Sequence, residues 1–225
     1  MATRKYEQRL RADSAQETRR RVLDAVYQRL RDAPTEQVSI ERVAAMAGVS
    51  RSTVYLMFGS RAGLFDALGE DLRSRGGFDR AADGAGHTDA RTGLMASIRA
   101  SVPVFAAHRE VLRVLYSMAQ LNPEAVGGAV QRMGEARAAG VTWHAQRLAE
   151  QDALRPDLTA ADAVHLLWAV TGFEFFDQLY TGRALSADTV ADMMVAAAER
   201  AVLRPDGQNT TPPPNPDALG LGLGE

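Results

Sequence analysis

Apolar residues recur every three or four positions along most of the chain, and no run alternates between apolar and polar residues as a β-strand would. This pattern predicts an all-α protein. In the first third of the chain it favours a helix over residues 15–32. Three short helices follow, and each begins after a serine that can cap a helix N-terminus, namely Ser39, Ser50 and Ser60. Gly48 separates the first two short helices.

The rest of the chain predicts a bundle of longer helices within residues 89–203. We expect these helices over residues 89–107, 109–120, 123–151, 159–181 and 186–203, with Pro103 bending or shortening the first of them. Composition then divides the chain into five parts. They are a flexible basic arm (1–14), an N-terminal helical domain (15–75), a glycine-rich linker (76–88), the bundle, and a disordered tail rich in Pro and Gly (204–225).

Residues 39–58, SIERVAAMAGVSRSTVYLMF, fit two short helices joined by a tight turn. Gly48 supplies the positive φ that such a turn needs, and Ala44 is small enough to let the helices cross closely. Val49 and Val54 can fill the space between them. This combination predicts a helix-turn-helix motif. An ordinary helical hairpin with a glycine turn is the alternative.

The second helix of this motif would expose side chains without an acidic residue among them. Arg51, at its N-terminal end, can donate two hydrogen bonds to guanine O6 and N7 in the major groove. The hydroxyls of Ser52, Thr53 and Tyr55 can bond to phosphates and so fix the position of the helix on the duplex. The motif therefore predicts sequence-specific binding to double-stranded DNA.

The charge distribution favours an anionic partner for the N-terminal third only. Residues 1–75 carry 14 Lys and Arg against 10 Asp and Glu, whereas the remainder carries 12 against 18. The chain has no Cys, no apolar run of about 20 residues and no apolar N-terminal signal. Its four His lack metal-ligand spacing, and no catalytic motif is present. We therefore expect a cytoplasmic protein that does not associate with a membrane. We also expect that it is not an enzyme and holds no metal or cofactor.

Residues 18–72 resemble the DNA-binding domain of the tetracycline-repressor (TetR) family of bacterial regulators. The matching segments are RRRVLDA (19–25), Ser39 with Ile40, VAAMAGVSRSTVYLMF (43–58) and SRAGLFDAL (60–68). The resemblance implies DNA contacts at the corresponding positions, which are Ser39, Arg51, Ser52, Thr53, Tyr55, Leu56 and Arg61. Among them, Leu56 would face the groove together with Met57, whereas Ser39 and Arg61 would meet phosphates. The resemblance also implies repression, and a helical C-terminal domain that dimerises and holds an inducer.

The C-terminal helices carry polar groups within apolar runs, as a ligand pocket would. We expect an unknown small-molecule effector, mainly apolar with one cationic or hydrogen-bonding end. Candidate lining residues are Phe105, Tyr116, Trp143, Trp168, Thr171, Glu174 and Phe175. The alternative is a plain core, to which aromatic residues at helical spacing more often belong. Glu174 either meets a cationic or polar ligand or is a solvent-facing or interface acid beside an arginine.

One short helix contacts too few bases alone, so we expect a homodimer on a pseudo-palindromic operator. Two C-terminal helices offer apolar residues at helical spacing for a four-helix interface. The expected interface residues are Phe173, Phe176, Tyr180, Val190, Met194, Ala197 and Ala201. The sequence thus predicts a transcription regulator, most simply a repressor that a small molecule releases. A helical ligand-binding or protein-interaction module with a non-functional helix-turn-helix is the alternative.

Overall fold

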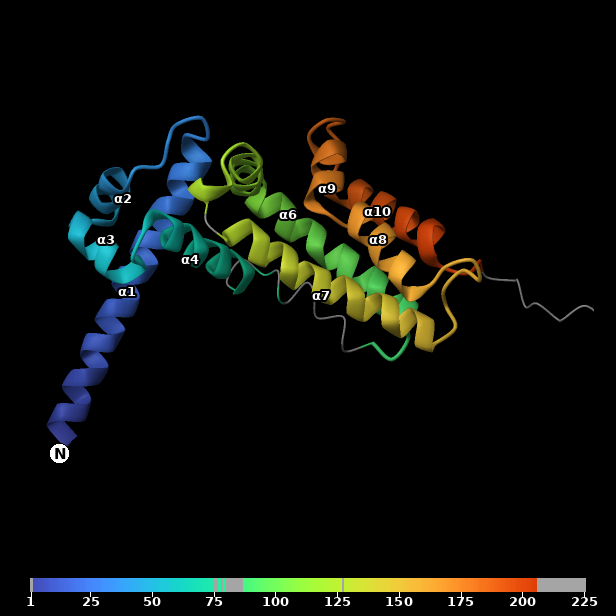
Figure 1. Cartoon of the computed structure of the whole chain (residues 1–225), viewed down its shortest axis with the longest axis horizontal. Coiled ribbons are helices and arrows are strands. Elements are labelled where there is room, and N and C mark those ends of the chain that lie inside the picture. Colours follow the sequence, from blue (N-terminus) through green and yellow to red (C-terminus); the bar gives the residue numbers. More distant parts are fainter. Residues whose placement is uncertain (1, 75–76, 78, 80–86, 127, 206–225) are drawn as a thin grey trace, which may run out of the picture.

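A computed structural model describes residues 2–74, 77, 79, 87–126 and 128–205 of the chain (Figure 1). Within these residues the regular structure is helical, with one isolated β-bridge between Leu154 and Leu203. Two groups of helices lie side by side along the long axis of the molecule, and α1 extends outward from the first group. The predicted all-α fold is confirmed.

The first group holds α1 (Ala2–Asp32), α2 (Ile40–Ala47), α3 (Arg51–Phe58) and α4 (Arg61–Ser74). Its helices bury apolar residues at the spacing that the sequence predicts, including Val22 and Val26 of α1, Val43 of α2 and Phe65 of α4. The four helices therefore enclose one small core beneath the helix-turn-helix.

The first helix begins earlier than the sequence pattern predicts. A loose arm was expected over residues 1–14, but α1 is helical from Ala2. Residues 2–14 contain neither Pro nor Gly and are mostly good helix formers, so nothing in them stops a helix that continues towards the N-terminus. The predicted linker and tail lie largely outside the described residues.

The second group holds α6 (Ala90–Leu121), the short 3-10 helix η2 (Pro123–Ala125), α7 (Ala129–Glu150), α8 (Ala160–Val170), α9 (Phe173–Tyr180) and α10 (Ala187–Val202). Its core includes Phe105 of α6, Leu148 of α7, Leu167 of α8, Phe176 of α9 and Met194 of α10. Neighbouring faces of all five long helices therefore meet in one interior.

Two helix boundaries differ from the prediction. Pro103 neither ends nor splits α6, because it lies on an exposed side of a long helix whose other face is buried at Val102 and Phe105. The expected helix over residues 159–181 is two helices, because α8 ends before its C-cap Thr171 and α9 begins after its N-cap Gly172. That break places α9 at an angle to α8, as Figure 1 shows.

The two groups share part of their packing. Val111 and Leu115 of α6 belong to the same core as α1–α4, and so does Ala129 at the start of α7. The hydroxyl of Tyr27 on α1 lies 2.9 Å from Nδ1 of His108 on α6. The helix-turn-helix is therefore held against the bundle by an apolar seam and by a polar contact.

Candidate functional site

The turn between α2 and α3 has the geometry of a helix-turn-helix. Gly48 adopts the left-handed conformation, with φ of 66°, and its N–H donates to the Ala45 carbonyl. The Ser39 side chain accepts from the backbone N–H of Arg42 at the start of α2, and the Ser50 side chain accepts from that of Thr53 at the start of α3. Local sequence signals therefore fix both helices and the turn.

The outer face of α3 offers the side chains that the sequence predicts. Arg51, Ser52, Tyr55 and Leu56 are exposed, and Leu56 is 88% exposed. A singly exposed leucine is common on protein surfaces, so its exposure fits a groove-facing position without indicating one. Thr53 is half-buried, and its hydroxyl lies 2.8 Å from that of Ser50.

Arg51 is held in place from two sides in the free protein. Its Nη1 lies 2.7 Å from a carboxylate oxygen of Glu41 on α2, and its guanidinium carbon lies 5.4 Å from the centre of the Tyr55 ring. Both partners are solvent-exposed, so water screens the ion pair and it contributes little to stability. These two contacts therefore orient Arg51 at the N-terminal end of α3, and its guanidinium stays accessible to a DNA base.

Two further residues expected at phosphates lie at helix starts. Ser39 is exposed, although its oxygen already caps α2. Arg61 begins α4, is half-buried, and lies over the Phe65 ring at 5.5 Å. The guanidinium of Arg61 is therefore turned partly towards the protein. DNA contact by all seven residues stays a prediction.

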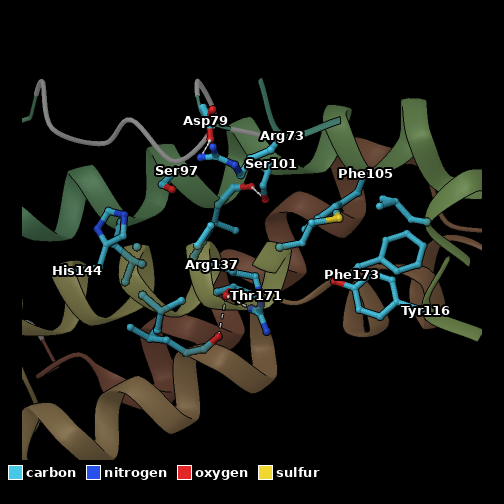
Figure 2. Close-up of a pocket in the computed structure, with 18 residues that line it drawn as sticks. Arg73, Asp79, Ser97, Ser101, Phe105, Tyr116, Arg137, His144, Thr171 and Phe173 are labelled. Atoms are coloured by element: carbon cyan, nitrogen blue, oxygen red, sulfur yellow. Dashed lines mark hydrogen bonds and ion pairs between the residues drawn. The ribbon is translucent and has the colours of Figure 1, made fainter. Parts of the chain in front are cut away.

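A cavity of about 160 Å³ lies inside the bundle, between α6, α7, α8 and α9 (Figure 2). Three of the expected lining residues, Phe105, Tyr116 and Thr171, do line it. Trp143, Trp168, Glu174 and Phe175 are not among its lining residues. Glu174 is exposed, because the break after Thr171 rotates the first turn of α9 towards solvent. The solvent-facing alternative for Glu174 therefore fits the structure.

Sequence reasoning missed the residues that give the cavity its polarity. Arg137 and His144 of α7 line it, together with Ser97 and Ser101 of α6. The signal was present in the sequence, because Arg137 interrupts an otherwise apolar helical stripe that includes Val141 and Leu148. A cation in such a stripe indicates either an ion pair or a ligand.

His144 and Tyr116 are perturbed by burial in the cavity wall. Burial, with a smaller contribution from the nearby Arg147 charge, lowers the pKa of His144 to about 4. Its imidazole is therefore neutral at pH 7, and Nε2 is buried with no hydrogen-bond partner among the described residues. Burial also raises the pKa of Tyr116, so its hydroxyl stays protonated and can donate.

The expected dimer-interface residues are mostly internal to one subunit. Phe173, Phe176, Val190 and Met194 are each 4% exposed or less, and they pack in the bundle core. Tyr180, Ala197 and Ala201 are half-buried. The prediction failed for the buried four because an apolar helical stripe does not reveal whether it faces its own core or a second subunit.

Exposed apolar side chains lie instead on other faces of α8 and α10. They are Leu166 and Trp168 of α8 and Met193 of α10, with exposed fractions between 37% and 43%. The sequence singles out only Trp168 among them, and it places Trp168 in the pocket. These two helices pack against each other, so they form one surface of the bundle.

The fold and the motif agree with comparisons to known proteins. Residues 22–68 match the model of the family described as bacterial regulatory proteins, tetR family. No curated protein matches the chain. NalD of Pseudomonas aeruginosa, the secondary repressor of the MexAB-OprM multidrug efflux pump, is 22% identical with a TM-score of 0.66, over 85% of this chain and 98% of NalD.

Two other solved structures show the same fold. A TetR-family transcription regulator of Marinobacter aquaeolei is 20% identical with a TM-score of 0.64, over 88% of this chain and 100% of the other. A protein of Saccharomonospora viridis, solved in complex with choline, is 21% identical with a TM-score of 0.66, over 84% of this chain and 100% of the other. At these identities the likeness concerns the fold.

A capped helix-turn-helix with an acid-free α3, joined to a helical bundle, defines a DNA-binding transcription regulator. Residues 22–68 are similar to the DNA-binding domain of the TetR family, and the chain as a whole shares the fold of solved TetR-family regulators. None of the described helices is both long and apolar enough to span a membrane.

Proposed function

We propose that this regulator is a repressor whose dimer binds a pseudo-palindromic operator and is released by a small molecule in the bundle cavity. Arg51 contacts base edges at the start of α3. Ser52, Thr53 and Tyr55 contact phosphates along it, and Ser39 and Arg61 contact phosphates at the starts of their helices. Blocking of polymerase at the operator accounts for repression.

The exposed face of α3 is the observation that carries the DNA-binding part. Arg51, Ser52 and Tyr55 are exposed on a helix whose opposite side, at Val54, is 1% exposed. No carboxylate lies on that helix to repel phosphates. A helix of eight residues held by Ser50 and Gly59 caps can enter a major groove with its N-terminal end first.

The cavity supports release by an effector. It lies beside α6 and α7, and both of these helices also contact the core of the DNA-binding domain through Val111, Leu115 and Ala129. A ligand that shifts α6 or α7 would therefore move α1–α4. A tenfold loss of operator affinity requires about 1.4 kcal/mol of differential ligand binding between the two dimer shapes.

The test begins with selection of genomic fragments by the purified protein, followed by affinity measurement on the selected operator and on random duplex. We expect Arg51→Ala to weaken operator binding by about 1–3 kcal/mol, roughly 5- to 150-fold, with a much smaller loss on random DNA. Arg99→Ala is the matched control, because Arg99 is an exposed arginine of α6 that pairs with Asp192 in the bundle.

The Arg99→Ala variant should bind the operator as the wild type does. An equal loss on operator and random duplex in Arg51→Ala would reduce Arg51 to a phosphate contact. If the wild-type protein enriches no genomic fragment over random DNA at physiological salt, the proposed function is wrong.

A further inference from the structure

The cavity contains a cation, Arg137, that forms no direct ion pair with an acidic group of the described residues. Nη1 of Arg137 donates to the Thr171 hydroxyl at 3.3 Å, and Nη2 donates to the Trp168 carbonyl at 2.9 Å. Both partners are neutral oxygens, and no carboxylate of the described residues forms an ion pair with Arg137. Burial lowers the pKa of Arg137, but an arginine pKa is so high that the side chain keeps its charge.

The acidic groups near this cation are either already paired or exposed. Asp79 lines the cavity, but it forms an ion pair with Arg73 at 3.0 Å, and Arg73 also pairs with Glu70. The Glu174 carboxylate lies near Arg137 and its charge acts to raise the pKa of Arg137, but Glu174 is exposed to solvent and forms no ion pair with the guanidinium. A half-buried charge of this kind is costly unless something pairs with it. An anionic ligand would supply the direct partner that the guanidinium lacks.

The remaining wall is shaped for a small apolar group. One side is aromatic: the ring centre of Phe173 lies 5.8 Å from that of Phe105 and 5.6 Å from that of Tyr116. Ile98 and Leu167 add aliphatic surface. Figure 2 shows Arg137 and Thr171 between this ring cluster and His144. A volume of about 160 Å³ is close to that of an engineered apolar cavity of roughly 150 Å³ that admits benzene.

We propose that the cavity binds a small monocarboxylate with an aromatic or short alkyl body, and that its carboxylate pairs with Arg137. The body occupies the space beside Phe105 and Phe173, and the Tyr116 hydroxyl is placed to donate a further hydrogen bond. The proposal rests on the proposed function, since it names the chemical class of the molecule that releases the operator. It also reverses the charge that the sequence had suggested for the ligand.

A cationic ligand is disfavoured by the same residues. Arg137 lies 3.6 Å from the centre of the Trp168 ring, so this indole face is already occupied by a cation. A quaternary ammonium beside Tyr116 and Phe173 would have the Arg137 charge as its neighbour, whereas the Glu174 carboxylate that also acts on Tyr116 is exposed to solvent and lies outside the lining. Repulsion in a site of low dielectric would then oppose binding.

The experiment measures direct binding to the full-length dimer by calorimetry and by thermal shift, at constant ionic strength. Benzoate and hexanoate are compared with benzamide, benzylamine and choline. We expect both carboxylates to bind at least about tenfold more tightly than the amide and both cations, because a charge-assisted hydrogen bond is worth that much. Failure of both carboxylates to bind at 10 mM, roughly the weak limit for a site of this size, would overturn the proposal.

Two variants test the role of Arg137. Arg137→Met should reduce carboxylate affinity at least about tenfold and leave benzamide affinity within a factor of three. Arg137→Lys keeps the charge and should keep the preference for carboxylate over amide, with circular dichroism confirming that both variants are folded. A carboxylate preference that survives in a folded Arg137→Met variant would overturn the assignment to Arg137.

Operator release, measured separately, distinguishes this proposal from the proposed function. Carboxylates that bind through Arg137 but leave operator affinity unchanged would support the ligand class and contradict regulation from this cavity. If a neutral or cationic molecule releases the operator while carboxylates do not bind, the ligand class is wrong and the proposed function stands.

Discussion

His144 shows how a single buried residue connects the cavity with protein stability. The residue is 6% exposed, and its ring contacts that of Trp143 at a centre-to-centre distance of 4.9 Å. Because Nε2 has no partner among the described residues, protonation would place a charge in a wall that does not compensate it. The pKa of about 4 expresses this cost.

We predict that acid destabilises the ligand-free protein through His144. An unfolded histidine takes up a proton near pH 6.5, whereas folded His144 does so only near pH 4. The unfolded state therefore binds more protons between these values, and the free energy of unfolding falls as the pH falls. The contribution of His144 between pH 7 and pH 5 is about 1–2 kcal/mol. Urea titrations at both pH values measure it.

The control replaces a different histidine. His144→Leu should remove most of this loss, since leucine has a similar volume and no titrating group. His165→Asn, on the exposed side of α8, should keep the wild-type loss. An unchanged pH dependence in His144→Leu would contradict the assignment.

At the scale of elements, the sequence predicts best where the signals are local. The caps of α2 and α3 and the turn at Gly48 are set by residues within four positions, so the helix-turn-helix was predicted with its correct limits. The break between α8 and α9 was missed because it depends on tertiary contacts. Arg137 of α7 donates to the Trp168 carbonyl and the Thr171 hydroxyl near the end of α8, and an apolar pattern within 159–181 does not record this.

The packing of α4 on α7 depends on a glycine. Gly69 is buried in α4, and a Cβ added there would lie 3.2 Å from the Cβ of Ala129. We therefore predict that Gly69→Leu lowers the free energy of unfolding by about 1–3 kcal/mol, because overpacking forces the helices apart. It should also change operator affinity, since α4 joins the recognition domain to the bundle. Chemical denaturation and operator titration measure the two effects.

The matched substitution is Gly134→Ala in α7. The added Cβ would meet Trp168 at an ordinary distance of 3.7 Å, so the gain in helix propensity should dominate. We expect stability to rise by about 0.5–1 kcal/mol. Wild-type stability in Gly69→Leu would show that α4 and α7 pack less closely than the structure indicates.

At the scale of the whole molecule, the sequence predicts that the bundle holds a pocket, but it does not predict which residues form the complete lining. An excess of apolar helix and the polar interruptions indicated a pocket, and Phe105, Tyr116 and Thr171 were placed in it. The ligand charge that we propose differs from the one expected from the sequence, because Glu174 and Arg137 both interrupt apolar runs and only the tertiary structure shows that Arg137 lines the cavity and Glu174 does not.

The dimer interface is also a property of the whole molecule, and the exposed side chains of α8 and α10 predict where it lies. The buried stripe of α10 includes Val190, Met194 and Ala198, whereas Met193 lies off that stripe and is 43% exposed. If α8 and α10 of two subunits form the dimer interface, Met193→Arg should give folded monomers, because an unpaired charge would be buried there. Phe176→Asp should instead unfold the subunit, since Phe176 is 0% exposed within it.

Sedimentation at micromolar concentration, combined with circular dichroism, separates these outcomes. Met46→Arg is the control, because Met46 of α2 is also 43% exposed and lies outside the bundle, and it should remain dimeric. Monomeric Met193→Arg should bind the operator about 100-fold or more weakly, since a second half-site no longer adds its effective concentration. A wild-type protein that sediments as a monomer and still binds the operator tightly would rule out this assembly, because each α3 would then act alone.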